Sequence, residues 1–396
     1  MPSSPDVSVV IPTLNRPDLA VRAVRSALGQ TFEALEVIVV VDGPDPGSEA
    51  ALAEIDDPRL RVLVLPSRGK APNARNQGAL AAKGHWTALL DDDDEWLPTK
   101  VESQLALAAT SGKPSPVIAT RMISRSPRAD NVMPRRLPAP GEPLSEYFTV
   151  RRGLFYGDGF IQTSTIMAPT ALMRRVPFTV GLRRQQELDW ALRAVREDDV
   201  ELLYADEPLV VWHQDEDRDR ISLENPWEEQ LAWLRANREL FTPRAYAAFT
   251  MSVLSSMAAP TRSRKVFREL LSEARTHGRP GAIDYVTFLQ IWSLPPTLRA
   301  RLRDLIVGRR SGAAASPASP APASPAPASP APAPPAPAPP APASAVDGSP
   351  SAEGRSFEGG SSPAGSSSHA GNAEAAAAEA AGAEAAGAEA AGADVR

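Results

Sequence analysis

Short runs of continuous apolar residues alternate with helix-like stretches over the first hundred residues. The apolar runs are predicted strands at residues 7–11, 37–41, 60–65 and 86–90. Helices are predicted between them at 19–28, 48–55 and 73–82. Strands that are apolar on both faces and separated by helices are typical of a mainly parallel sheet covered on both sides. The pattern therefore predicts an α/β fold of the Rossmann-like kind, with ligands at the carboxyl ends of its strands.

The pattern becomes less regular after residue 115. Strand-like pieces are found at 117–123, 163–168, 202–204 and 209–212, around a helix-like stretch at 187–195. We interpret residues 1–223 as one α/β domain whose second half shapes an acceptor site. Residues 224–310 are predicted to form an appended helical region, with helices at 227–240, 243–257, 264–276, 283–292 and 296–307.

Residues 311–396 are low in sequence complexity. Repeats of Pro-Ala and Pro-Ala-Ser run to about residue 342, and a Gly/Ser-rich joint leads to an Ala-rich end. The repeats favour polyproline II without a core. At the end, Glu recurs every five residues from Glu374 to Glu389. This spacing turns successive side chains by about 140°, so no single helix face forms. We predict a disordered tail that serves either as a solubilising spacer or as a tether to a partner.

Net charge and cysteine content exclude several classes of function. The net charge of −6 falls entirely in residues 311–396, which hold two Arg and eight acidic residues. The rest is neutral and offers no basic face for nucleic acid. The absence of Cys excludes disulfides, thiolate catalysis and Cys-ligated zinc, and suits a cytoplasmic protein. We expect no signal peptide, and no run approaches the ~18–20 apolar residues that a spanning helix needs.

Four consecutive aspartates, at positions 91–94, follow the predicted strand at 86–90. Carboxylates grouped at the end of a strand can hold a hard divalent cation, Mn²⁺ or Mg²⁺, which is often shared with substrate phosphates. A solvated acidic turn is the alternative. The apolar strand before the run and the Glu-Trp-Leu-Pro segment after it favour the metal site.

Two other ends of predicted elements carry candidates for nucleotide binding. Asp42 ends the strand at 37–41, where a carboxylate can accept hydrogen bonds from a ribose or a base; a turn aspartate before Gly43 is the alternative. The helix that opens near Asn73 can attract phosphate, and Arg75 can add a charged contact; a capping Asn and a surface Arg are the alternative. Nicotinamide and ATPase-type phosphate motifs are absent from the sequence.

Taken in order, these segments resemble the family 2 glycosyltransferases, which have the GT-A fold. The matching segments are 7–16, 36–43, 73–78, 90–98 and 186–193, with weaker matches at 208–213 and 220–222. They span roughly residues 6–223. The resemblance implies an inverting transfer of a sugar from a nucleotide-sugar to an acceptor hydroxyl. UDP is the expected nucleotide, and the acceptor would be a glycan, a lipid or another molecule.

The resemblance also implies roles for individual residues. Asp91 and Asp93 would hold the metal ion as an Asp-x-Asp motif, and Asp91 and Asp92 would serve the nucleotide-sugar. The other implied nucleotide-sugar contacts are Pro12, Thr13, Asn15, Arg16, Asp42 and Arg75. His213 matches a histidine that lies by the metal in some members, although a lone His after a strand is often structural.

The helix at 187–195 resembles the family's Glu-Asp segment, whose second acid is the catalytic base. This chain has Gln186-Glu187 there, which departs from the usual pair but keeps a carboxylate one methylene longer. Asp189 is the alternative base. An exposed helix face is the non-catalytic interpretation of both acids.

Two functions other than glycosyl transfer, and contact with a membrane surface, remain as alternatives. A nucleotidyltransferase would share the fold, but the first strand meets Pro-Thr-Leu-Asn-Arg rather than a Gly-rich loop. A degenerate scaffold would bind a nucleotide-sugar or a partner without catalysis. The apolar segment 283–294 would allow peripheral contact with the inner face of the cell membrane, whereas packing in a core would also explain it.

Overall fold

The computed structural model describes residues 5–126, 130–153, 159–214 and 226–294, together with Leu298. Contacts along the chain group the described residues as one compact unit. The predicted tail at 311–396 and most of the predicted helix at 296–307 lie outside the described residues. The predicted domain boundary at residue 223 also lies outside them and stays a prediction.

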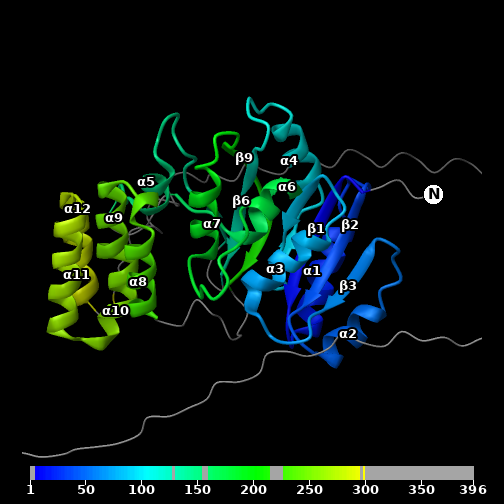
Figure 1. Ribbon diagram of the computed structural model, residues 1–396, viewed down its shortest axis with the longest axis horizontal. Coiled ribbons are helices and arrows are strands. Elements are labelled where there is room, and N and C mark those ends of the chain that lie inside the picture. Colours follow the sequence, from blue (N-terminus) through cyan, green and yellow to red (C-terminus); the bar gives the residue numbers. More distant parts are fainter. Residues whose placement is uncertain (1–4, 127–129, 154–158, 215–225, 295–297, 299–396) are drawn as a thin grey trace, which may run out of the picture. The chain divides into compact units, whose positions relative to one another are not determined.

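The described residues contain a sheet of nine strands, which is the centre of the α/β region (Figure 1). The strand order is β3-β2-β1-β4-β8-β6-β9-β5, with β7 beside β6. The strands are β1 Val7–Thr13, β2 Leu35–Val41, β3 Leu60–Val64, β4 Trp86–Leu89, β5 Asp94–Trp96, β6 Val117–Arg125, β7 Asp130–Met133, β8 Met167–Pro169 and β9 Leu202–His213. Strands β1 to β4 are parallel, which confirms the predicted α/β sheet, and β5, β7 and β8 add antiparallel pairs.

The central strands bury both of their faces. Alternate side chains of a strand point to opposite sides of the sheet, and β1 sends Val9 to one core and Val10 to the other. The first core is covered by α1 Pro17–Leu28, α2 Pro46–Ala53 and α4 Lys100–Ala108. The second is covered by α3 Lys70–Ala81, α6 Thr170–Arg175 and α7 Gln186–Ala194. This double burial is why β1 and β2 are apolar at nearly every position.

A glycine lets α3 approach the sheet closely. A Cβ atom at Gly78 would lie only 2.2 Å from Cγ1 of Val10 in β1, so a larger residue would push the helix away. The start of α3 is thereby held beside the carboxyl ends of β1 and β2, where the candidate site lies.

Two strand predictions in the second half need correction. The predicted strands at 202–204 and 209–212 are one strand, β9. Its register with β6 shifts on either side of Arg121, which is opposite Pro208; proline cannot donate to a ladder, so such a residue is found at a bulge. The predicted strand at 163–168 begins instead as the 3-10 turn η1 Thr163–Thr165, followed by β8. The polar side chains of this turn bond to nearby groups and compete with sheet pairing.

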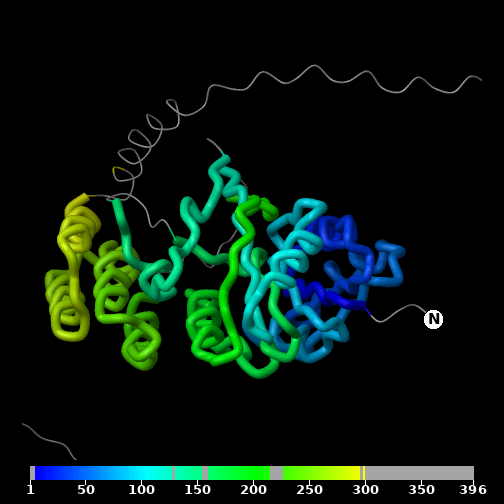
Figure 2. Tube along the Cα trace, turned by 90° about the horizontal axis from the view of Figure 1, so that it is seen from above, coloured from blue at the N-terminus to red at the C-terminus, as the bar shows by residue number. Residues whose placement is uncertain are grey.

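The helical region folds as a series of short helices, which Figure 2 shows in yellow-green to yellow. They are α8 Trp227–Ala236, η3 Arg238–Leu240, α9 Pro243–Phe249, η4 Thr250–Leu254, α10 Ser255–Ala258, η5 Ala259–Thr261, α11 Arg264–His277 and α12 Ala282–Ser293. The predicted helix at 243–257 is interrupted by η4, which is a π-helix. A third core joins this region to Leu188 and Leu192 of α7. Among the described residues, no helix is both long and apolar enough to cross a bilayer.

Candidate active site

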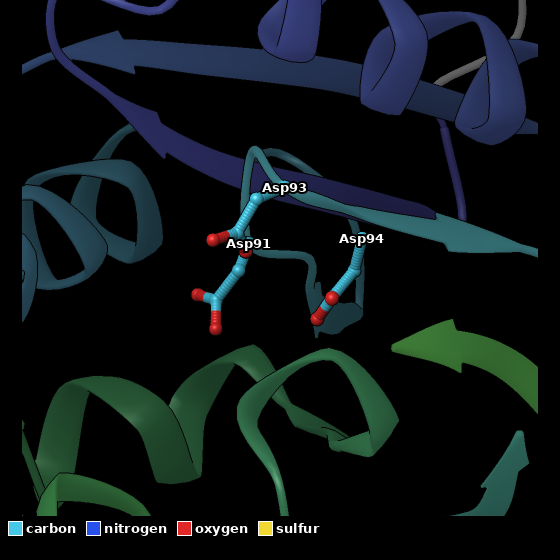
Figure 3. A group of neighbouring side chains, drawn as sticks. All are labelled: Asp91, Asp93 and Asp94. Carbon is cyan, nitrogen blue, oxygen red and sulfur yellow. The ribbon is translucent and has the colours of Figure 1, made fainter. Parts of the chain in front are cut away.

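The loop after β4 gathers three carboxylates. Single oxygen atoms of Asp91, Asp93 and Asp94 all lie within 4.8 Å of one another (Figure 3). Within the described part of the chain, Oδ1 of Asp94 is buried without a hydrogen-bond partner. An all-oxygen set with one unsatisfied buried atom fits a hard cation such as Mn²⁺ or Mg²⁺.

The electrostatics of this loop agree with a site built for a cation. Burial raises the pKa of Asp92 to about 6, and the charge of Asp93 adds to the rise. Burial, followed by the charges of Asp93 and Asp91, also raises the pKa of Asp94 well above its ordinary value. Carboxylates that repel one another while buried are typical of functional sites, because a ligand can relieve the repulsion.

A polar turn at residues 162–165 holds the carboxylates from the other side. The amide Nε2 of Gln162 donates to Oδ2 of Asp94 at 2.7 Å and to Oδ2 of Asp91 at 3.3 Å. The hydroxyl of Ser164 donates to Oδ2 of Asp94 at 2.6 Å and accepts from the backbone N–H of Asp91 at 2.9 Å. This turn therefore fixes two of the three candidate metal ligands.

The same turn reaches the candidate base. Oγ1 of Thr163 donates to Oε1 of Glu187 at 3.0 Å, so the first turn of α7 lies against η1. Arg75, which is buried, makes a second link: its Nη2 lies 2.6 Å from Oδ1 of Asp91, and its Nη1 donates to Oε1 of Gln186 at 2.6 Å. Because Gln186 is neutral, Asp91 is the acid that offsets the guanidinium charge in these contacts.

Four of the expected nucleotide-sugar residues lie at the end of β1 or just after it, close to the acidic loop. Oγ1 of Thr13 donates to Oδ2 of Asp92 at 2.8 Å. Arg16 places Nη1 at 3.2 Å from Asp92 Oδ1 and 3.4 Å from Asp93 Oδ2. Asn15 has a left-handed backbone, with φ of 55°. Pro12 is buried within β1. The structure brings these residues together, and their contacts with a donor stay predictions.

Asp42 makes long-range structural contacts that the sequence did not indicate. Its two oxygens accept hydrogen bonds from the backbone N–H groups of Gly69 at 2.8 Å and Lys70 at 2.7 Å. The carboxylate therefore holds the start of α3, where Lys70 adopts a positive φ of 66°. The expected contact between Asp42 and a ribose or base stays a prediction.

Residues 8–179 match the family model described as glycosyl transferase family 2. This segment of the chain is therefore a family 2 glycosyltransferase domain. This confirms the resemblance, and with it the expectation that the chain carries a glycosyltransferase domain of the GT-A kind.

Several known proteins are similar to the family 2 domain. A succinoglycan biosynthesis protein of Rhizobium meliloti is 40% identical over 109 residues, which is 27% of this chain and 31% of that protein. An Escherichia coli UDP-Glc:α-D-GlcNAc-diphosphoundecaprenol β-1,3-glucosyltransferase is 33% identical over 104 residues, 26% of this chain and 41% of its own. The chain thus spans about a third of the length of these relatives. The solved structure of S. aureus TarS with UDP-GlcNAc aligns at a TM-score of 0.44 and 17% identity, over 77% of this chain and 87% of that one.

Asp189, the alternative base, lies in an enclosed setting. It is only 1% exposed, and its oxygens accept hydrogen bonds from Thr179, Arg193 and the indole Nε1 of Trp233. These contacts join α7 to α8 through the Asp189–Trp233 bond. The expected role of Asp189 as the alternative base stays a prediction.

His213 lies in a different setting from the one expected. Its Nε2 is 2.7 Å from Oε1 of Glu95, and the described acidic cluster contains Asp94 in its place. The histidine ends β9 beside β5, so it borders the acidic loop without joining the three carboxylates. Its expected role as a metal ligand stays a prediction.

The sequence-based prediction placed Asp94 in the acidic run without a role of its own, and it missed the turn residues Gln162, Thr163 and Ser164. Asp94 was one of four identical residues, and only the turn of the loop separates their environments. The run Gln-Thr-Ser-Thr at 162–165 offered a signal, because four polar residues inside an apolar, strand-like stretch are unusual for a buried strand.

A separate cavity lies along α1. It has a volume of about 700 Å³ and is lined by residues of α1, α2 and the segment 95–98, including Arg22 and Glu95. None of the predicted site residues lines it. Its link to the family 2 site is Arg22, whose Nη2 donates to the backbone oxygen of Asp93 at 2.9 Å.

Proposed function

We propose that this family 2 domain transfers a sugar from a nucleotide-sugar to an acceptor hydroxyl, with inversion at the sugar carbon. The observation that carries the proposal is the acidic loop after β4. Three of its carboxylates lie close together, and two of them, Asp91 and Asp94, meet one polar turn that also contacts Glu187. Transfer needs stabilisation of the leaving diphosphate and a base for the acceptor. One small region offers both groups.

Asp91, Asp93 and Asp94 would hold the cation, Mn²⁺ or Mg²⁺. A bound divalent cation offsets the negative charge that develops on phosphate oxygens, which is typically worth several kcal/mol. The protein's own contribution is to keep the carboxylates in position: Arg75 holds Asp91, while Gln162 and Ser164 hold Asp94. Arg16, beside Asp92 and Asp93, would add positive charge toward the diphosphate.

Glu187 would act as the general base. An acceptor hydroxyl is a poor nucleophile, and a positioned carboxylate that removes its proton typically accelerates the reaction by about 10²–10⁴-fold. The hydrogen bond from Thr163 fixes one oxygen of Glu187, which leaves the other for the acceptor. Attack from this side, opposite the departing diphosphate, gives inversion.

We further propose UDP as the nucleotide and a polyprenol-linked sugar as the acceptor. The support is the E. coli relative, whose name specifies UDP-Glc and a diphosphoundecaprenol-linked GlcNAc. A lipid-linked acceptor would bring the enzyme to the cytoplasmic surface of the membrane. In α12, Phe288 and Ile291 are buried in the core, whereas Val286 and Leu289 are about half exposed and are the residues that would touch a bilayer.

Thermal unfolding tests the proposal. The protein is measured with UDP, GDP or dTDP, each with and without Mn²⁺, as wild type and as Asp93→Ala. A shift that needs both UDP and Mn²⁺, and that disappears in the variant, is expected from ligand-linked stabilisation. Turnover of UDP-sugars with a polyprenol-linked acceptor then tests the reaction.

Other outcomes point to the other functions. Binding of nucleotide and metal without turnover of any donor would favour the degenerate scaffold. Release of pyrophosphate from a nucleoside triphosphate would favour a nucleotidyltransferase.

A further inference from the structure

A lysine is buried beneath the acidic loop without an acidic partner. Lys100, at the start of α4, is completely buried, and no carboxylate pairs with it in the described ranges. Its Nζ donates to Oε1 of Gln104 at 2.6 Å and lies 3.8 Å from the centre of the Trp96 ring. Lysine is rarely fully buried unless it is paired, so its position here calls for a role.

Lys100 determines how Gln104 is oriented. The oxygen and nitrogen of an amide have nearly the same shape, and their partners decide which end faces which way. Because Lys100 donates to Oε1, Nε2 is directed to the opposite side. There it donates to the backbone oxygens of Ile118 at 2.8 Å and Thr165 at 2.9 Å.

Gln104 and Trp96 together hold the backbone of the turn at 162–165. The indole Nε1 of Trp96 donates to the backbone oxygen of Ser164 at 2.9 Å, next to the Thr165 oxygen that Gln104 holds. The side chains of this turn then point to the site: Gln162 and Ser164 contact the acidic loop, and Thr163 contacts Glu187. A single buried support thus lies behind both halves of the proposed reaction.

We propose that Lys100 and Gln104 are positioning residues for sugar transfer. They touch neither substrate nor metal, and they act by fixing the turn at 162–165 so that the carboxylate cluster and Glu187 keep their relative geometry. The inference rests on the proposed function. Residues that orient metal ligands typically change metal affinity or activity by about 10–100-fold when they are lost.

The first test compares two buried glutamines. Gln104→Leu removes the amide behind the turn. Gln30→Leu is the matched control for a buried amide. Gln30 donates to the backbone oxygen of Leu97 at 2.9 Å and accepts from the backbone N–H of Val101 at 3.0 Å, and among the described residues it has no hydrogen bond to the turn. Mn²⁺ binding is titrated by electron paramagnetic resonance in the presence of UDP, which requires no turnover, and kcat and KM are measured in parallel.

We expect Gln104→Leu to weaken Mn²⁺ binding and lower kcat by about tenfold or more, while Gln30→Leu leaves both within about twofold. Equal effects of the two variants would overturn the proposal. Mn²⁺ binding by the wild type without any sugar transfer would instead contradict the proposed function and leave the metal-binding comparison intact.

The second test uses Lys100→Met, which keeps the apolar length of the side chain and removes a buried amine. If Lys100 only stabilises the fold, the melting temperature and kcat of the variant should change together. The positioning role predicts that they separate: the melting temperature is unchanged or higher, whereas kcat and Mn²⁺ affinity fall. A variant that melts higher with wild-type kcat and Mn²⁺ affinity would rule out a positioning role for Lys100, and this variant also serves if Gln104→Leu does not fold.

Discussion

The acidic loop after β4 and the helical region at 226–294 both bury carboxylates, but the pKa values of these carboxylates shift in opposite directions. In the loop, burial and neighbouring acids raise the pKa of Asp92 and Asp94. In the helical region, burial also acts to raise the pKa of Glu273, but hydrogen bonds from Arg235 and Tyr246 outweigh it, and the pKa lies below its ordinary value.

The difference separates the two uses of a buried acid. Glu273 accepts hydrogen bonds from the Arg235 guanidinium and the Tyr246 hydroxyl, and Asp284 pairs with Arg244. These acids therefore contribute to stability without a bound ligand. In the loop, Oδ1 of Asp94 is buried without a hydrogen-bond partner among the described residues, and a ligand of positive charge would satisfy it. Buried acids whose pKa values are raised by one another mark a functional site more clearly than the number of acids does.

The largest expected effect distinguishes two acids of α7. Glu187→Gln should lower kcat by about 10²–10⁴-fold, because the base is lost, while the thermal shift with UDP and Mn²⁺ is retained. Asp189→Asn is the matched control and should mainly lower the melting temperature, because it weakens the bonds to Arg193 and Trp233. Kinetics and melting curves on both variants measure the contrast, and a large loss of kcat in a well-folded Asp189→Asn would reverse the assignment.

A smaller effect is expected in the helical region. Glu273→Gln replaces a charged acceptor with a neutral one and should reduce the free energy of unfolding by about 2 kcal/mol. The value is modest because the Arg235 side chain is 48% exposed, so solvent screens the pair. Denaturant unfolding measures the loss. Mn²⁺ affinity and kcat should not change, and a change in either would show that the two regions are coupled.

The pH dependence of the metal-free protein should reveal the acidic loop. The pKa of Asp92, about 6 in the folded state, exceeds the value of about 3.9 expected in the unfolded chain. Its contribution to stability is therefore complete below about pH 4 and is lost as pH rises through 6. We expect Asp92→Asn to remove about 2–3 kcal/mol of this decline between pH 4 and 7. Chemical denaturation across that range, with a chelator present, is the measurement; parallel curves for the two proteins would show that Asp92 does not titrate in this way.

The smallest effect concerns the exposed side of α12. Leu289→Asp should change the free energy of unfolding by no more than about 0.5 kcal/mol, because the side chain is largely in solvent. If this face touches a bilayer, the variant should nevertheless float less with anionic liposomes than the wild type. Ser293→Asp adds the same charge at another exposed position of α12 and is the control. Equal flotation of the wild type and both variants would show that this face of α12 does not contact the bilayer.

The sequence predicted the parallel half of the fold well, for a physical reason. Strands such as β1 and β2 are buried on both faces, so their apolar runs are visible without knowledge of their partners. The three-residue strand β5 was missed because Asp94–Trp96 pairs only with the distant β9. Long-range pairing of this kind leaves no local pattern.

The candidate site was predictable in part. Asp91, Asp93 and Glu187 follow from their places at the ends of elements and from the family's motifs. Gln162 and Ser164 could not be assigned, because their partners lie about 70 positions away in the chain. Lys100 resembles a surface lysine at the start of a helix, and only the packing of Trp96 and Gln104 around it shows that it is buried.

The bond between Asp189 and Trp233 has a practical consequence for where this enzyme can be cut. A fragment that ends at residue 223 would contain the whole family 2 match but would lack α8. Asp189 would lose its indole partner, and Leu188 and Leu192 would face water on the helix that carries Glu187. We therefore expect that the smallest fragment able to fold with α7 in place extends through α12.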